Sequence, residues 1–279
     1  MKIITNELIQ KFKVFLTDEE KAIATIEKYI HDVLVFMTWL AGAEVTKSTV
    51  LEYKQEIVEK FAPASVNSVI SSLNSFFSFN EWYDCKIKAL KIQKQIFANK
   101  EKELTKAEYS KLLVAAQEKK NQRLYYLMQT ICSTGIRVSE LRFITVDAVI
   151  KGQAIINCKG KMRIVILPKQ LCKMLKSYVK DNNIKNGPVF VTRTGKPLDR
   201  SNIWKLLKSL CESAGVQKDK VFPHNLRHLF ARTFYSLQKD IVRLADILGH
   251  SSVNTTRIYT KENGDIHRKQ LQKLGLLMC

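Results

Sequence analysis

The chain has 279 residues, of which 46% are apolar and 26% charged, proportions typical of a soluble globular protein with room for two domains. Its 46 Lys and Arg outnumber 26 Asp and Glu, which gives a formal charge of +20. So large an excess of one sign indicates a polyanionic partner, and nucleic acid is the first candidate, ahead of an anionic membrane surface.

Several other classes of protein are disfavoured by the sequence. The longest apolar run, 33–43, is interrupted by Thr38 and falls short of the ~20 residues of a membrane span. No apolar run with a small-residue cleavage site marks a secretory signal near Met1. The six cysteines are scattered without the spacing of metal ligands. We therefore expect a cytoplasmic protein with no membrane association and no metal or other cofactor.

The first ninety-odd residues predict an all-helical region. Apolar residues recur at helical spacing over 18–42, from Thr46 or Ser48 to Phe61, and onward from Pro63. An aromatic cluster at 76–83 would suit stacking on bases, but at helical spacing such residues more often belong to a core. We expect the core role.

A lysine-rich stretch then leads to residues 94–103, which we interpret as an interdomain linker, either solvated or lying across a phosphate backbone. Thr105 and Glu108 have the spacing of a capping box and should open a helix. A second helix should reach Gly135, and a new one should start near Ser139. Later helices are expected over 201–214, 223–237 and 241–248, near 259, and in a tail from about 265.

Between these helices the texture changes to short β-branched segments. AIINC and MRIVIL flank Lys159-Gly160-Lys161 and predict a β-hairpin, and PVFV at 188–191 predicts a third strand. The expected fold class is therefore mainly α, or α+β overall: an all-helical N-terminal domain followed by a helical domain with a small antiparallel sheet.

Four residues near the C-terminus suit a phosphate site. His224 and Arg227, three apart, share a face at the start of a helix, where the helix end favours an anion. His250 follows Gly249, a predicted helix C-cap, so it should lie at a chain reversal. Tyr259 is nine residues further on. Each alone has an ordinary explanation, such as a surface pair, a helix-end histidine or a core aromatic.

Two upstream clusters carry further cations. Arg137 follows Gly135 at a turn, and its planar guanidinium matches two phosphate oxygens. Nearby Glu140 would repel a phosphate, so we expect it to cap backbone N–H groups. Lys159 lies in the predicted hairpin turn, with Lys161 as an equally flexible neighbour.

Taken together and in this order, TGIRVSEL, CKGK, HNLRHLFA and LGHSSVNTTRIYT resemble the motif boxes of the tyrosine recombinase family, which includes phage-type integrases and Xer-like resolvases. The resemblance is close over residues 98–265. More loosely, residues 1–97 resemble that family's core-binding domain, which leaves 98–279 as the catalytic domain with a C-terminal tail helix.

The resemblance implies a site-specific recombinase that needs no ATP or metal. Tyr259 would attack the scissile phosphate and form a 3′-phosphotyrosyl link, while Arg137 and Arg227 clamp its non-bridging oxygens. His250 would donate to one of those oxygens, Lys159 (or Lys161) would protonate the leaving 5′-oxygen, and His224 would assist proton removal from Tyr259. A phenol has a pKa near ~10, so it needs such help to act as a nucleophile.

The family also implies double-stranded DNA with short inverted half-sites, a homotetramer passing through a Holliday junction, and exchange of the tail helix between protomers. The chain starts almost directly with the core-binding helices, so we expect no additional arm-binding domain, while accessory proteins stay open. Two alternatives are a DNA-binding protein that has lost cleavage and a type IB topoisomerase-like nicking-closing enzyme.

Overall fold

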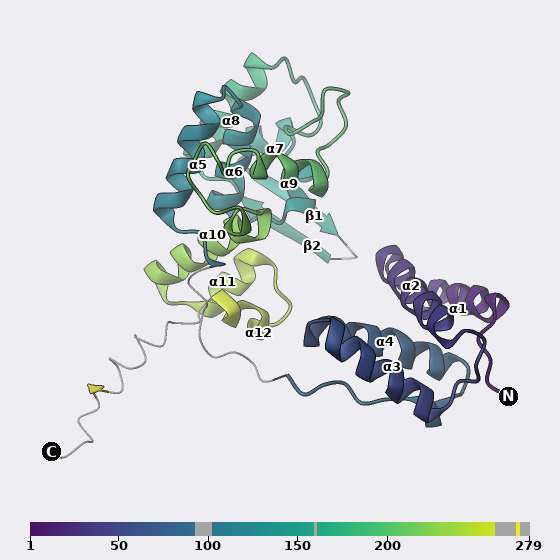
Figure 1. Cartoon of the computed structure of the whole chain (residues 1–279). Helices are drawn as coiled ribbons and strands as arrows, with labels where there is room; N and C mark the ends of the chain where they lie inside the picture. Colours follow the sequence, from purple (N-terminus) through teal and green to yellow (C-terminus); the bar gives the residue numbers. More distant parts are fainter. Residues whose placement is uncertain (93–101, 159–160, 260–271, 274–279) are drawn as a thin grey trace. The chain divides into compact units, whose positions relative to one another are not determined.

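The computed structural model describes residues 1–92, 102–158, 161–259 and 272–273 (Figure 1). The chain divides into two compact units, Met1–Lys94 and Gln95–Cys279. Helices dominate both units, and the second also holds a sheet of two antiparallel strands. The predicted mainly α fold class is therefore confirmed. Within the described residues, no helix combines the length and apolar character needed to span a membrane.

The first unit packs its helices around an aromatic core. Phe12, Phe36, Phe76 and Phe77 are all fully buried. Of these, Phe76 and Phe77 are members of the aromatic cluster predicted at 76–83, and they belong to the core, as expected. Tyr83 is 61% exposed. The helices are α1 (Asn6–Asp18), α2 (Ile23–Leu40), α3 (Lys47–Lys60) and α4 (Pro63–Phe79), followed by the 3₁₀ turn η1 (Tyr83–Cys85).

The helix predicted over 18–42 forms as α2 with narrower bounds. It begins only at Ile23, because a separate helix, α1, ends at Asp18. Glu20 between them has a φ of 53°, a left-handed conformation that ends the first helix. The apolar spacing of α1 itself was missed, although its buried residues Ile9, Phe12 and Leu16 follow the helical period.

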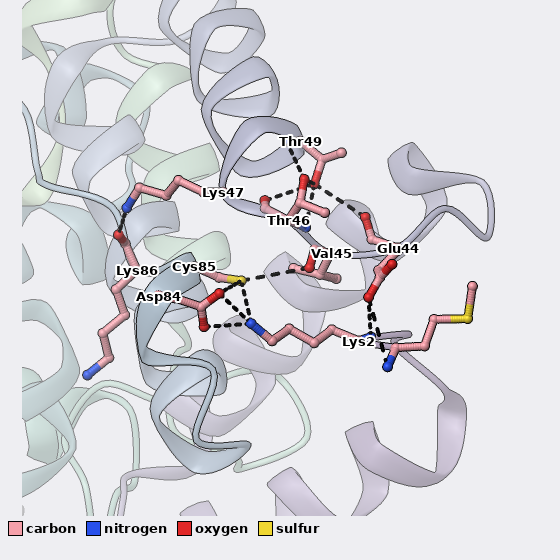
Figure 2. Close-up of polar contacts among 10 residues, drawn as sticks. Lys2, Glu44, Val45, Thr46, Lys47, Thr49, Asp84, Cys85 and Lys86 are labelled. Atoms are coloured by element: carbon pink, nitrogen blue, oxygen red, sulfur yellow. Dashed lines mark hydrogen bonds and ion pairs between the residues drawn. The ribbon is translucent and has the colours of Figure 1, made fainter.

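The first residues of the chain form hydrogen bonds with the loop between α2 and α3 and with η1 (Figure 2). The Lys2 N–H donates to the Glu44 carboxylate at 2.9 Å, and the Lys2 carbonyl accepts from the Val45 N–H at 2.7 Å. Lys2 Nζ donates to Asp84 Oδ1 at 2.6 Å. These contacts join the N-terminus, the loop between α2 and α3, and η1 in one cluster.

The second unit has its own core, to which a two-stranded hairpin contributes one face: Ala154 and Ile156 are buried, whereas Ile155 and Ile164 on the other face are exposed. Strands β1 (Gln153–Cys158) and β2 (Lys161–Ile166) pair with Ile155 opposite Ile164, so the predicted hairpin forms. The helices are α5 (Lys106–Glu118), α6 (Gln122–Thr134), α7 (Val146–Lys151), α8 (Lys169–Asp181), α9 (Arg200–Lys208), α10 (Pro223–Gln238), α11 (Ile241–Leu248) and α12 (Val253–Thr256). The 3₁₀ segments η3 (Val138–Phe143), η4 (Lys218–Lys220) and η5 (Arg257–Tyr259) join them.

Sequence signals for helix ends were reliable in this unit. The Thr105 side chain accepts from the Glu108 N–H at 3.1 Å, while the Glu108 carboxylate accepts from the Thr105 N–H at 2.8 Å, which is the predicted capping box. Gly135 and Gly249 end α6 and α11 in the left-handed conformation, with φ of 64° and 63°. These two turns bring the motif residues that follow them back toward α10.

Three predicted elements differ. Residues 188–191 do not extend the sheet, because Val189 donates its N–H to Ile144 O at 2.8 Å and its side chain is buried in the core instead. The helix predicted near Ser139 is the 3₁₀ segment η3, and the helix predicted over 201–214 is α-helical only as far as Lys208. The predicted linker core, the Lys159-Gly160 turn and most of the tail lie outside the described residues.

Candidate active site

Arg227 is the buried centre of the site. It projects from α10 one turn after Pro223 and is only 2% exposed. Its Nη1 donates to Gly135 O at 2.6 Å and its Nη2 to Leu248 O at 2.8 Å. These are carbonyls at the C-terminal ends of α6 and α11, which lack partners within their own helices. The planar guanidinium therefore holds three helices together while keeping its charge inside the fold.

The turn at Gly135 leaves no room for a side chain. A Cβ there would lie 2.4 Å from Phe230 Cδ1 and 2.9 Å from Leu248 Cδ2. The close approach of α10 and α11 to this turn allows Arg227 to reach the Gly135 carbonyl. Packing at Gly135 and the position of Arg227 are thus linked.

His250 binds directly to Arg227. The Nε2 atom lies 2.9 Å from Arg227 Nη2, and Nδ1 lies 2.9 Å from the hydroxyl of the buried Thr256. Arginine can only donate, so we assign Nε2 as the acceptor and place the ring proton on Nδ1, facing Thr256. Burial, together with the nearby charges of Arg227 and Arg137, lowers the pKa of His250 to about 4. The ring is therefore neutral at neutral pH.

Tyr259 is packed between two imidazole rings. Its side chain is 3% exposed, and its ring centroid lies 4.6 Å from that of His228 in a T-shaped contact. The His250 ring stacks nearly parallel to it at 5.9 Å. Tyr259 also raises the pKa of Arg227, opposing the larger effect of burial, which lowers that pKa to about 10. The predicted nucleophile thus lies beside the predicted phosphate-binding groups.

His224 reaches the tyrosine only through another residue. Its ring contacts that of His228 at 4.4 Å, and His228 in turn contacts Tyr259. Burial and the neighbouring charges of Arg227 and Arg137 lower the pKa of His224. Burial, His224 and Arg227 lower the pKa of His228 to about 4. His228 was not predicted as a site residue, although it directly follows Arg227 in the HNLRH motif.

Arg137 forms the solvent-facing part of the cluster. Its side chain is 40% exposed, and its Nη1 pairs with Glu140 Oε1 at 2.9 Å. Glu140 also accepts from the Arg137 backbone N–H at 2.9 Å, the capping role expected for it, and from Arg163 Nη2 at 2.6 Å. Burial alone would raise the pKa of Glu140, but these donors and the Arg163 charge lower it, so the carboxylate is ionised.

A cleft of about 1110 Å³ opens over these residues. Its lining includes Arg137, Glu140, Arg163 and His250, joined by Arg142 and Asn157 from η3 and β1. Figure 1 shows α10, α11 and α12 next to one another at one end of this unit. Two motif segments and the hairpin strands, far apart in sequence, therefore line one basic cleft. Among the described residues, no three His, Cys, Asp or Glu side chains group closely enough to hold a metal ion.

Comparison with known proteins identifies the family. Residues 102–265 match the model of the phage integrase family. Tyrosine recombinase XerA of Thermococcus kodakarensis is 31% identical over 281 residues, which span 98% of this chain and 96% of that relative. The chain belongs to the phage integrase family of tyrosine recombinases.

Further relatives agree with this assignment. Tyrosine recombinase XerD of Listeria monocytogenes is 30% identical, over 91% of this chain and 94% of its own length. The crystal structure of XerA recombinase matches with a TM-score of 0.53 and 27% identity, over 99% of this chain and 100% of that one. A lambda integrase dimer bound to a core site matches with a TM-score of 0.76 and 18% identity, over 93% and 96%, and shows the same fold.

In this tyrosine recombinase family member, the structure brings together five of the six predicted site residues. Arg137, Arg227, His250 and Tyr259 form one connected cluster, with His224 at its edge. The sixth, Lys159, lies outside the described residues, and the choice between Lys159 and Lys161 stays a prediction. Two cluster members were missed by sequence reasoning. His228 was signalled by its place in the motif, whereas Arg163 had no signal beyond its position in a strand.

Proposed function

We propose that this chain is a site-specific recombinase that cuts and rejoins DNA through a 3′-phosphotyrosyl intermediate at Tyr259. The observation that carries the proposal is the contact of a buried tyrosine with His250, which is itself bonded to Arg227. A phenol next to Arg227 and neutral histidines suits attack on a phosphodiester, where negative charge builds on the non-bridging oxygens. The formal charge of +20 supports a polyanionic substrate.

The proposed reaction exchanges one phosphodiester for another. The Tyr259 oxygen bonds to phosphorus, the bond from phosphorus to the 5′-oxygen breaks, and the phenolic proton is lost while the 5′-oxygen gains one. Arg137 and Arg227 bind the non-bridging oxygens. His250 adds a hydrogen bond, which requires its ring proton to move from Nδ1, facing Thr256 in the free protein, to Nε2. We assign the general acid to Lys159, with Lys161 as the alternative. The phosphodiester energy is kept in the new link, so neither ATP nor a metal ion is consumed.

The burial of Tyr259 adds one requirement. At 3% exposure Tyr259 is buried from a DNA strand, so we propose that α12 and η5 shift when DNA binds. Both elements are short, and residues 253–255 are exposed, which makes such a shift inexpensive. The same shift is needed for His224 to act on the hydroxyl directly, since His228 lies between the two rings.

The proposed partners rest on analogy with DNA-bound structures of similar fold. A lambda integrase tetramer bound to a Holliday junction matches this chain with a TM-score of 0.72 and 18% identity. By analogy, we propose a homotetramer on synapsed DNA with short inverted half-sites, in which the C-terminal tail docks on a neighbouring protomer. Apolar residues in the tail, Ile266, Leu271, Leu274 and Leu277, have the spacing of one helix face.

Covalent trapping tests the chemistry. The protein is incubated with labelled DNA flanking its own gene, denatured with SDS, and examined for a protein–DNA adduct. We expect an adduct from the wild type and none from Tyr259→Phe, which retains the ring but lacks the attacking oxygen. An adduct in both would move the nucleophile to Tyr235. Tight binding without any adduct would instead support an inactive DNA-binding protein, and site-independent relaxation of supercoils by a monomer a topoisomerase.

Deleting residues 263–279 tests the assembly. We expect the truncated protein to bind a single half-site normally but to lose recombination, because the tail would no longer bridge protomers. Binding is measured by gel shift and recombination by product formation on paired sites. Recombination at the wild-type level would refute tail exchange without touching the cleavage proposal.

A further inference from the structure

Arg163 connects three elements of the site from the hairpin. It lies on β2, and its side chain is only 16% exposed. Nη2 donates to Glu140 Oε2 at 2.6 Å, and Nη1 donates to Ile247 O near the end of α11 at 2.6 Å. One guanidinium therefore bridges the segment that carries Arg137 and the segment that leads into His250.

The backbone at Gly249 packs closely against the Arg163 side chain. A Cβ on Gly249 would lie 2.3 Å from Arg163 Cδ and 2.7 Å from Nε. Contacts this short cannot occur, so a side chain at residue 249 would displace the Arg163 side chain from its present position. The left-handed φ of 63° at Gly249 is a second and separate reason for glycine. The backbone that leads into His250 therefore packs directly on the Arg163 side chain.

The charge of Glu140 is divided between two arginines. Its Oε1 accepts from Arg137 Nη1 at 2.9 Å, while its Oε2 accepts from Arg163 and from the Arg137 N–H. Arg163 is the more buried partner, and the 40% exposed Arg137 faces the cleft. If a neutral residue replaced Arg163, the buried Glu140 carboxylate would be balanced by Arg137 alone. Glu140 would then compete with a phosphate for Arg137.

We propose that Arg163 is a positioning residue for the phosphate site. It fixes Arg137 relative to His250 by bridging Glu140 to the end of α11, and it neutralises Glu140 so that Arg137 remains available to the substrate. The proposal rests on the proposed cleavage function, because it concerns how the same phosphate is bound. Arg163 itself need not touch DNA.

The first test compares Arg163→Met with a matched control, Arg123→Met. Arg123 also donates to a backbone carbonyl, Val191 O at 2.7 Å, and its Nε, like that of Arg163, is buried without a partner. Arg123 lies at the N-terminal end of α6, whereas Gly135 lies at its C-terminal end. On the DNA site mapped by trapping, we expect Arg163→Met to slow adduct formation by at least about tenfold, because displacing Arg137 weakens one of the donors to the phosphate. Half-site affinity and the control should change by less than about twofold.

A neutral substrate separates positioning from general damage. With a methylphosphonate at the scissile position, one non-bridging oxygen is replaced by a methyl group and the linkage carries no charge. If Arg163 acts by keeping Arg137 available, the deficit of Arg163→Met relative to wild type should shrink severalfold on this substrate. A deficit of equal size on both substrates would overturn the proposal. Arg163→Lys, which can reach only one of the two partners, should be intermediate and guards against misfolding of Arg163→Met.

A double-mutant cycle gives an independent reading. Gly249→Ala should reduce adduct formation, and part of that loss should disappear when Arg163→Ala is present, because the clash partner has gone. Fully additive losses would contradict the link between the two residues. The outcomes also distinguish the two proposals: a wild type that forms no adduct refutes the cleavage function, whereas a normal wild type with a fully active Arg163→Met refutes only this inference.

Discussion

Replacing Gly135 by alanine should destabilise the second unit far more than an ordinary helix-capping substitution. The new Cβ would meet Phe230 at 2.4 and 2.6 Å and Leu248 at 2.9 Å. Overpacking of this kind costs about 1–3 kcal/mol, and the left-handed φ of 64° adds about 1–2 kcal/mol for alanine. The total of about 2–5 kcal/mol corresponds to a fall in melting temperature of about 4–20 °C for a unit of this size.

Gly152→Ala is the matched control. Gly152 also ends a helix of the same unit, with a φ of 73°, but a Cβ there would meet nothing within 4 Å. It should therefore lose only the backbone contribution of about 1–2 kcal/mol. Thermal unfolding followed by circular dichroism compares the two variants with the wild type. Equal losses would show that the packing of Phe230 and Leu248 against this turn is looser than the structure indicates, and would refute the reasoning.

Two further predictions concern the histidines. His228→Ala should slow adduct formation at Tyr259, whereas His228→Phe should largely preserve it, because the ring contact at 4.6 Å holds the tyrosine and a histidine of pKa about 4 is a weak base; equal defects would assign a role to the ring nitrogens. Folding stability should fall as the pH is lowered from 6.5 toward 4, because His228 and His250 stay neutral in the fold whereas in the unfolded chain they take up protons. Each histidine should lower the free energy of unfolding by at most about 1.4 kcal/mol per pH unit. Melting temperatures that stay constant from pH 7 to 4.5 would contradict this.

The motif boxes were predictable because local chemistry marks them. Gly135 and Gly249 signalled chain reversals, and each places the next motif residue, Arg137 or His250, directly after a left-handed turn. His224 and Arg227 follow from helical spacing and from Pro223 at the first turn. Each of these features depends on neighbours within about one helical turn, and such neighbours are visible in the sequence.

The features that were missed depend on partners far away in the chain. Arg163 reads as one residue of an alternating strand, and its role comes from Ile247, 84 positions away. The segment 188–191 has the composition of a strand, but its hydrogen-bonding partner is Ile144, not the hairpin. No periodicity carries that information. The burial of Tyr259 likewise results from packing against α10, which composition does not reveal.

Among the described residues, the site holds more arginines than carboxylates. Helix ends explain how the fold tolerates this excess of positive charge. Arg227 donates to Gly135 O and Leu248 O, and Arg163 donates to Ile247 O. These carbonyls belong to the C-terminal ends of α6 and α11, which carry partial negative charge and lack intrahelical partners. Each arginine therefore satisfies an orphan acceptor and lies at the negative end of a helix dipole. Among the described residues that contact these arginines, Glu140 supplies a full negative charge, and it divides this charge between Arg137 and Arg163. The cluster is thus stable before any phosphate arrives, yet Arg137 remains exposed enough to bind one.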